Sequence, residues 1–230
     1  IDTIGGLQIV RNGAYDAKKG VVTFATNHFS HYMIKNKYVK FNDVADGFWG
    51  KPAIDFAAAR GLVAGIGNNK YNPGRAITRA EFVQMMQNVL NLPAADSSVA
   101  TYADVVKNND WFYETVMSAK AVGLLKGIKL DGNKFLPNKA ITREEMAAIM
   151  ANTATYKKAS VSSEIFDLTV FKDYKSINKD FYDAISISIN LGLLNKAGTG
   201  GGNFSPKASV TRAAAAEIQR NLIKALNFAD

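Results

Sequence analysis

Hydrophobic residues recur at helical spacing in three pairs of segments between residues 38 and 228. In each pair the first segment starts near an aromatic residue and ends at a Gly-Leu dipeptide, and the second starts at a Thr-Arg dipeptide. Apolar residues three or four positions apart share one face of a helix, so we predict three helix–loop–helix units. The second segments carry these apolar stripes: Phe82, Met85, Met86 and Val89; Met146, Ile149 and Met150; Ile218, Leu222 and Leu226.

Local signals mark where these helices should begin and end. Gly61, Gly123 and Gly192 stand where a glycine commonly follows the last turn of a helix. Each loop between the two helices of a unit contains a proline, which cannot continue a helix. The second helices should start at Thr78, Thr142 and Thr211, and a glutamate stands three residues after the first two of these. We therefore predict capping boxes at Thr78 with Glu81 and at Thr142 with Glu145, and Thr211 as a simpler cap.

The three units are copies of one repeat. An aromatic-x-Asp motif, a large aromatic residue, a Gly-Leu pair, an aromatic-x-Pro loop and an Ile/Val-Thr-Arg motif follow one another in the same order each time. A search for such internal repeats comes first because it decides the architecture. We predict repeats at 38–99, 100–158 and 159–230, with the polar stretch 153–167 as a connection. The corresponding residues are Asp43, Asp104 and Asp173; Trp49, Trp111 and, one position late, Phe181; and Arg79, Arg143 and Arg212.

Residues 1–37 follow a different pattern. Short β-rich runs, "LQIV", "VVTFAT" and "HYMIK", are separated by turn-forming residues. Three strands alone bury little surface, so we interpret 1–37 as a small β-meander that either ends a preceding domain or is a remnant packed on the helices. No targeting segment is recognisable at residue 1, and we expect the chain to begin inside a longer protein.

Composition narrows the function classes. The chain has no cysteine, which excludes disulfides and cysteine-ligated metals. With 28 basic and 20 acidic residues its net charge is +8, which attracts polyanions. The basic residues are spread out, so a dedicated nucleic-acid arm is not indicated. No apolar run is long enough to span a membrane. We expect neither cofactor, metal nor catalysis. We interpret the two histidines, His28 and His31, as surface residues without a catalytic role.

The repeated arginines and tryptophans are not explained by helix capping. An arginine at the first helical position opposes the helix dipole at a small cost, so its threefold recurrence indicates another use. Its planar fork of donors suits a carboxylate or a phosphate. That partner is either internal, with Asp43, Asp104 or Asp173 as candidates, or a ligand, and spacing alone leaves both open. A tryptophan here fits the core or the rim of a groove equally.

Together these motifs resemble the S-layer homology (SLH) module, here in three copies over residues 38 to 228. "FNDV", "GLVAG", "YNPGRAITRAEF" and "FLPNKAITREEM" hold the order and spacing that carry the resemblance. It implies a mainly α fold, with three helix–loop–helix repeats in a pseudo-threefold bundle within one monomeric chain. It also implies anchoring at a bacterial cell wall or S-layer, outside the cell, by binding secondary cell-wall polysaccharide, in many members through a terminal pyruvylated N-acetylmannosamine.

The resemblance also implies site residues. The arginines would grip the pyruvate carboxylate, the aspartates would accept from sugar hydroxyls or orient the arginines, and the tryptophans would line grooves between repeats. Gly65 and Gly127 would let sugar approach the backbone. The ligand-binding residues expected on this basis are Arg79, Arg143, Arg212, Asp43, Asp104, Asp173, Trp49, Trp111, Gly65 and Gly127.

The third repeat departs from the pattern in three places. Asp180 stands where the tryptophan would be, Lys196 replaces the second glycine, and Ala214 replaces the glutamate. We therefore expect the third repeat to close the pseudo-trimer and to contribute less to binding, so that Arg79→Ala or Arg143→Ala weakens wall binding more than Arg212→Ala. Two other classes compete with the wall-binding interpretation: a helical protein–protein interaction scaffold and a polyanion-binding, for example nucleic-acid-binding, module.

Overall fold

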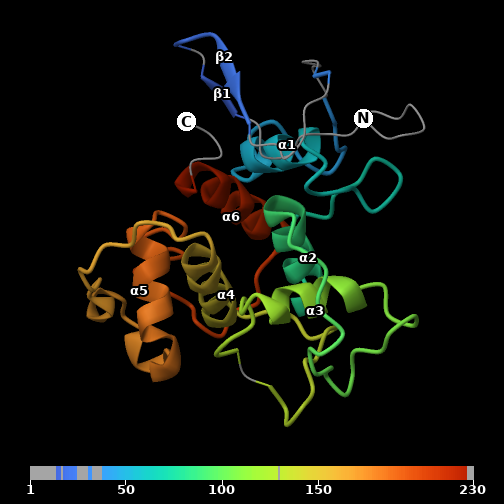
Figure 1. The fold of residues 1–230 in the computed structure, drawn as a ribbon. Coiled ribbons are helices and arrows are strands. Elements are labelled where there is room, and N and C mark those ends of the chain that lie inside the picture. The colour runs from blue at the N-terminus through green and yellow to red at the C-terminus, as the bar shows by residue number, and fades with distance from the viewer. Residues whose placement is uncertain (1–13, 17, 25–30, 33–37, 129, 227–230) are drawn as a thin grey trace. The chain divides into compact units, whose positions relative to one another are not determined.

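The computed structural model describes residues 14–16, 18–24, 31–32, 38–128 and 130–226. Of the expected β-meander, this part contains two short antiparallel strands, β1 (Ala14–Asp16) and β2 (Val21–Thr23), with Ala14 opposite Thr23. The run "LQIV", most of "HYMIK" and His28 lie outside the described residues. The rest of the described chain is helices and loops (Figure 1), which confirms the prediction of a mainly α fold.

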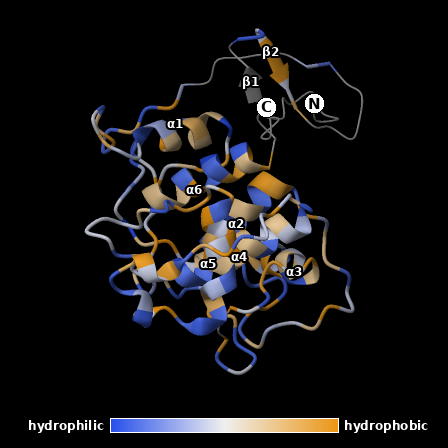
Figure 2. Ribbon diagram, turned by 90° about the vertical axis from the view of Figure 1, so that its left-hand side faces the viewer, coloured by the Kyte–Doolittle hydropathy of each residue, from blue (hydrophilic) through white to orange (hydrophobic). Residues whose placement is uncertain are grey.

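Six α-helices and three short 3₁₀ helices make up the described repeats. Each second helix begins at the arginine that follows the capping threonine, as predicted. Figure 2 shows hydrophobic and hydrophilic residues interleaved along these helices, as expected when one face is buried. The helices are α1 (Lys51–Ala59), α2 (Arg79–Leu90), α3 (Tyr113–Ala121), α4 (Arg143–Tyr156), α5 (Tyr182–Asn190), α6 (Arg212–Ala225), η1 (Leu168–Val170), η2 (Tyr174–Ser176) and η3 (Lys179–Phe181).

The predicted helix boundaries are confirmed except at the end of α4. The capping boxes of Thr78 with Glu81 and of Thr142 with Glu145 are complete. The three glycines that follow α1, α3 and α5 have positive φ values of 63°, 81° and 68°. The prediction that a connection starts at residue 153 was wrong, because α4 continues to Tyr156. Thr153 is fully buried and donates its hydroxyl to the carbonyl of Ile149, so a polar residue extends the helix instead of ending it.

The chain divides into two compact units. One comprises residues 1–74 and 212–230, and the other comprises residues 75–211. In the first unit α1 packs on α6. In the second unit α2 packs on α3, and α4 packs on α5. Each pair therefore joins the second helix of one repeat to the first helix of another.

A ring of backbone hydrogen bonds ties the three Ile/Val-Thr motifs together within the second unit. The amide of Ile77 donates to the carbonyl of Val210 at 2.9 Å, that of Val210 to Ile141 at 3.0 Å, and that of Ile141 to Ile77 at 3.1 Å. All three side chains are buried. The ring shows the threefold relation of the repeats directly, since each motif plays the same part toward the next.

The loop prolines complete the starts of the second helices. The first amides of a helix have no partner inside it. The amide of Ala80 donates to the carbonyl of Pro137, and that of Glu144 donates to Pro206, at 3.0 and 3.1 Å. In the first unit the amide of Ala213 donates to Pro73 at 3.0 Å. Each loop proline therefore contacts the start of the second helix of another repeat. None of the helices described is long and apolar enough to cross a membrane.

Candidate ligand-binding site

The repeated aspartates hold the aromatic-x-Pro loops of their own repeats. Asp104 accepts hydrogen bonds from the amides of Phe135 and Leu136, at 2.7 and 2.8 Å, one on each carboxylate oxygen. Leu136 has a φ of 57°, in the left-handed region that costs a non-glycine residue energy. The carboxylate therefore stabilises a strained loop. Asp173 makes the same contacts with Phe204 and Ser205, and Asp43 makes them with Tyr71 and Asn72.

These amide contacts also affect ionisation. Partial burial acts to raise the pKa of Asp43, but the hydrogen bonds from the amides of Tyr71 and Asn72 and the charge of Lys70 outweigh it, so the pKa lies below its ordinary value. Asp43 is therefore a carboxylate at neutral pH, and both of its oxygens already accept from backbone. The described geometry gives the aspartates a structural role that sequence reasoning had left open.

The repeated arginines reach the aromatic-x-Pro loop of another repeat. Arg79 Nη1 donates to the carbonyl of Phe135 at 2.7 Å, and Arg143 Nε donates to that of Phe204 at 2.9 Å. In the first unit Arg212 Nε donates to the carbonyl of Tyr71 at 2.8 Å. An arginine and an aspartate therefore hold the same loop, one by its carbonyl and the other by its amides.

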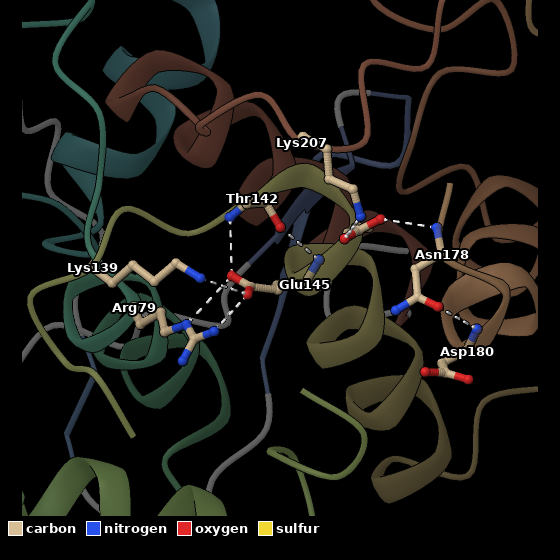
Figure 3. A network of polar contacts seen from close by, with 8 residues as sticks. Arg79, Lys139, Thr142, Glu145, Asn178, Asp180 and Lys207 are labelled. Atoms are coloured by element: carbon tan, nitrogen blue, oxygen red, sulfur yellow. Dashed lines mark hydrogen bonds and ion pairs between the residues drawn. The ribbon is translucent and has the colours of Figure 1, made fainter. Parts of the chain in front are cut away.

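Arg79 is an internal clasp in this structure. Its side chain is 1% exposed, and its Nη2 and Nε donate to the two oxygens of Glu145 at 2.5 and 3.3 Å. Figure 3 shows Arg79 and Lys139 both directed at the Glu145 carboxylate, which also accepts from the amide of Thr142. Of the two partners that the sequence allowed, the structure therefore supplies the internal one. It is a glutamate of the next repeat and not one of the three aspartates.

The clasp keeps Glu145 ionised although it is buried. Burial acts to raise the pKa of Glu145, and the hydrogen bond and charge of Arg79, the amide of Thr142 and the charge of Lys139 together lower it below its ordinary value. A buried ion pair with such hydrogen bonds tolerates poorly the removal of one partner. Arg79 and Glu145 thus contribute to holding repeats one and two together.

Arg143 has fewer partners than Arg79. Its guanidinium is half-buried, lies 5.0 Å from the ring centre of Phe204 and makes one hydrogen bond, through Nε. Burial lowers its pKa, and the charge of Asp173 opposes that effect. Within the described part of the chain no carboxylate lies within ion-pairing distance of it, and its two terminal nitrogens have no hydrogen-bond partner.

A second clasp, which sequence reasoning missed, joins repeats two and three. Glu144 is 4% exposed, forms an ion pair with Lys207 and accepts from the amide of Asn178. The signal was present in the "TREEM" motif, because Glu144 stands where the other copies have Ala80 and Ala213.

The two tryptophans are exposed. Trp49 is 61% exposed and Trp111 is 65% exposed, and their ring contacts are with the preceding Phe48 and the following Phe112. In the third repeat Phe181 is 1% exposed. It therefore corresponds to the buried Phe112, and Asp180 occupies the place of the exposed tryptophan.

The two glycines expected at the ligand have internal reasons to be glycine. A Cβ at Gly65 would lie 2.8 Å from the carbonyl oxygen of Lys70 and 2.9 Å from the ring of Phe41. Gly127 has a φ of 75°, with open space where its Cβ would be. Close packing therefore explains the first glycine, and backbone conformation explains the second.

A pocket of about 390 Å³ lies beside the aromatic-x-Pro loop of the second repeat. Its lining combines apolar surface with two carboxylates, an amide and a lysine, and Trp111 lies between two of the lining residues in sequence. The lining residues are Asp104, Asp110, Phe112, Leu136, Pro137, Asn138 and Lys139.

The fold and these contacts define a protein built from three copies of one helical repeat, joined by reciprocal contacts between copies. The family model of the S-layer homology domain matches the chain three times, at residues 40–83, 101–147 and 170–216. The chain belongs to the S-layer homology family, whose domains are cell-surface anchoring modules of S-layer proteins and cell-wall enzymes.

Relatives include both kinds of protein. The chain is 35% identical, over 92% of its length, to an amylopullulanase of Thermoanaerobacterium thermosulfurigenes, of which the match covers 11%. It is 35% identical over 84% of its length to exoglucanase XynX of Acetivibrio thermocellus, covering 17% of that protein. It is 31% identical over 77% of its length to an S-layer protein of Bacillus thuringiensis subsp. finitimus, covering 20% of it. The chain thus corresponds to a small part of these longer proteins.

Proposed function

We propose that the chain is a non-catalytic module that anchors a larger exported protein outside the cell by binding secondary cell-wall polysaccharide. Residues 1–37 would end a preceding domain, and the repeats at 38–99, 100–158 and 159–230 would form one monomeric binding module. The bound group we propose is an acidic sugar, with a terminal pyruvylated N-acetylmannosamine as the leading candidate. Family membership supports anchoring, and the polysaccharide is our extension of it.

The observation that carries the proposal is the exposure of Trp49 and Trp111 at equivalent positions of two repeats. A large aromatic side chain is usually at least partly buried in its own domain. An indole exposed twice at the same place offers a flat apolar face with a polar edge, which suits the face of a sugar ring. The pocket of the second repeat, whose lining includes the sequence neighbours of Trp111, Asp110 and Phe112, adds the Asp110 carboxylate, an amide and an ammonium group that can bond sugar hydroxyls.

The other expected site residues take two kinds of role in this proposal. Four of them would support the loops and would not contact the sugar themselves, because their polar atoms already bond to the backbone or to Glu145. These four residues are Asp43, Asp104, Asp173 and Arg79. Arg143 and Arg212 lie at the edge of the same loops and are only partly buried. The net charge of +8 favours an acidic polymer at long range.

Co-sedimentation with purified bacterial cell walls tests the proposal. The chain should sediment with intact walls and stay in solution with walls stripped of their secondary polysaccharide. The Trp49→Ala/Trp111→Ala variant should bind about tenfold more weakly or worse, a loss of ~1.4 kcal/mol or more. Tyr38→Ala is the matched control, because Tyr38 is also exposed, at 67%, and should leave binding unchanged.

Two results would overturn the proposal. The first is equal binding to intact and stripped walls. The second is preferential binding to mixed-sequence DNA or RNA with a steep loss on adding salt, which would favour the polyanion-binding alternative.

A further inference from the structure

A second pocket, of about 110 Å³, lies between the connection that follows α2 and the first turns of α3. None of the residues that the sequence analysis expects to bind a ligand lines it. We call it the linker pocket. Its polar lining consists of Asp96, Ser97 and Thr101 from the connection, Lys107 from the next loop, and Tyr113 and Glu114 from α3.

Hydrogen bonds hold the connection that forms one wall of the linker pocket. The Asp96 carboxylate accepts from the amide of Ser98 at 2.8 Å, and the amide of Val99 donates to the carbonyl of Asp96 at 3.1 Å. Further along, Lys120 Nζ of α3 donates to the carbonyl of Ala100 at 2.6 Å. The wall is therefore fixed both within itself and to α3, which gives the pocket a largely preformed shape, as in most small-molecule sites.

The lining of the linker pocket combines hydrogen-bonding groups with apolar surface from Val99 and Met117. Three hydroxyls, two carboxylates and one ammonium group supply both donors and acceptors. The side chains of Lys107 and Glu114 make no hydrogen bond or ion pair within the described residues. A sugar unit has the matching chemistry, because its C–H groups are apolar and its hydroxyls both donate and accept.

The charge of the linker pocket indicates which kind of sugar unit fits. Hydrogen bonds from Ser98 hold the pKa of Asp96 below its ordinary value, so Asp96 is ionised at neutral pH. Asp96 and Glu114 together outweigh Lys107, and the pocket is negative although the whole chain carries +8. Like charges brought together are unfavourable. The pocket therefore suits an uncharged sugar unit better than an acidic one.

The linker pocket adjoins the pocket beside the aromatic-x-Pro loop of the second repeat. Asp110 and Phe112 line the latter, whereas Tyr113 and Glu114 line the linker pocket. Phe112 and Tyr113 are consecutive residues, whose Cα atoms lie about 3.8 Å apart. The exposed Trp111 belongs to the same short stretch. A polymer bound in one pocket can therefore reach the other across the start of α3.

We propose that the linker pocket binds an uncharged sugar unit of the wall polysaccharide, next to the unit bound at the aromatic-x-Pro loop of the second repeat. This inference rests on the proposed function and specifies its ligand. The module recognises a stretch of at least two sugar units, and one charged end group is only part of what it binds.

Calorimetric titration with fragments of different length tests the inference. The probes are fragments of the polysaccharide released from purified walls, sorted into single repeating units and stretches of several units. The wild-type chain should bind the longer fragments about tenfold or more tightly. Ser97→Trp, which fills the pocket from an exposed position, should abolish this preference and leave the affinity for single units unchanged. Glu114→Gln, which removes one charge and one acceptor, should weaken only the longer fragments, roughly two- to tenfold.

Ser163→Trp is the matched control, because Ser163 is an exposed serine in another connection and lines neither pocket. It should keep the full preference for longer fragments. Thermal unfolding shows whether each variant is folded, and Glu114→Gln decides the matter if Ser97→Trp is not.

Three results would overturn the inference and leave wall anchoring intact. They are equal binding of both fragment lengths by the wild type, an unchanged preference in folded Ser97→Trp, and binding of walls without binding of any released fragment. Failure of the wild type to bind walls at all would instead remove the proposed function itself.

Discussion

At the scale of the residue, the same amino acid at the same repeat position takes different roles according to what lies opposite. Arg79 forms an ion pair with Glu145 and is buried, whereas Arg143 has no carboxylate within ion-pairing distance among the described residues. In the first unit Arg212 donates to the carbonyls of Tyr71 and Ala64 and lies 4.4 Å from the ring centre of Tyr71. A repeated motif thus preserves the contact with the loop carbonyl and leaves the charge partner free to vary.

Arg79→Met should destabilise the second unit strongly. It leaves the 4% exposed Glu145 with Lys139 at 3.6 Å as its nearest cation, and an uncompensated buried charge costs about 3–5 kcal/mol. Urea unfolding measures the loss. Arg75→Met is the control, because its pair with Glu81 is partly exposed and should be worth at most about 1 kcal/mol. Similar losses in the two variants would contradict the role of Arg79 as a clasp.

The same clasp predicts a pH dependence of stability. The pKa of Glu145 is lowered from its ordinary value of 4.5, so the folded state binds a proton less readily than the unfolded chain. Its contribution is complete above the ordinary value and is lost as the pH falls through the lowered folded pKa. The melting temperatures of the wild type and of Glu145→Gln should therefore converge as the pH falls below 4.5. A difference that stays constant over this range would argue against the clasp.

At the scale of the element, each pair of packed helices joins two different repeats. In the first unit α1 packs on α6, and a close contact at the start of α1 sets how near they approach. A Cβ at Gly50 would lie 2.9 Å from the ring of Phe48 and 3.1 Å from the Cβ of Ala213, which is itself buried. The glycine is required by space and not by backbone conformation, because its φ is −84°.

Gly50→Ala should therefore loosen the α1–α6 pair. Overpacking of this kind costs about 1–3 kcal/mol. Gly74→Ala is the matched control, because no atom lies within 4 Å of the added methyl group. Differential scanning calorimetry should show a lower melting temperature for the first variant and an unchanged one for the second; a wild-type melting temperature for Gly50→Ala would show that the contact relaxes freely.

At the scale of the whole molecule, one compact unit joins the two ends of the repeat region and the other contains the hydrogen-bonded ring. Residues 1–74 and 212–230 form the first unit through α1 and α6, and residues 75–211 form the second. The boundaries of the three repeats and of the two units do not coincide. The repeats are defined by the order of motifs along the sequence, whereas the units are defined by which residues contact one another.

Truncation after Thr211 should destabilise the first unit and leave the second unit folded. It removes α6, with its buried Ile218, Leu222 and Ile223, and leaves α1 without its packing partner. The ring through Val210 stays within the remaining chain. Hydrogen exchange followed by mass spectrometry should show lost protection in α1 and retained protection in α2 to α5. Protection of α1 in the truncated chain would show that α6 is dispensable for it.

Much of the local structure could be predicted from particular residues. Thr78 and Thr142 begin their helices with the predicted capping boxes, because a cap depends on residues only three positions apart. The end of α4 was mispredicted because polar residues were taken to mark an exposed connection, whereas Thr153 is fully buried and donates its hydroxyl to the carbonyl of Ile149 inside the helix. The exposure of Trp49 and Trp111 could not be predicted from the sequence alone either. Hydrophobic periodicity does not show which residues at the start of a short helix are covered by other elements.

The sequence by itself determined the three repeats, their helices, their caps and their membership of a family, because all of these depend on order, spacing and short-range hydrogen bonds. Only the tertiary structure decided which helix packs on which, that Arg79 is paired with Glu145, and that Arg143 retains unsatisfied donors. Those outcomes depend on contacts between residues far apart in the chain, such as Arg79 with Phe135 and Glu145, and no local pattern specifies which of several similar partners a side chain will meet.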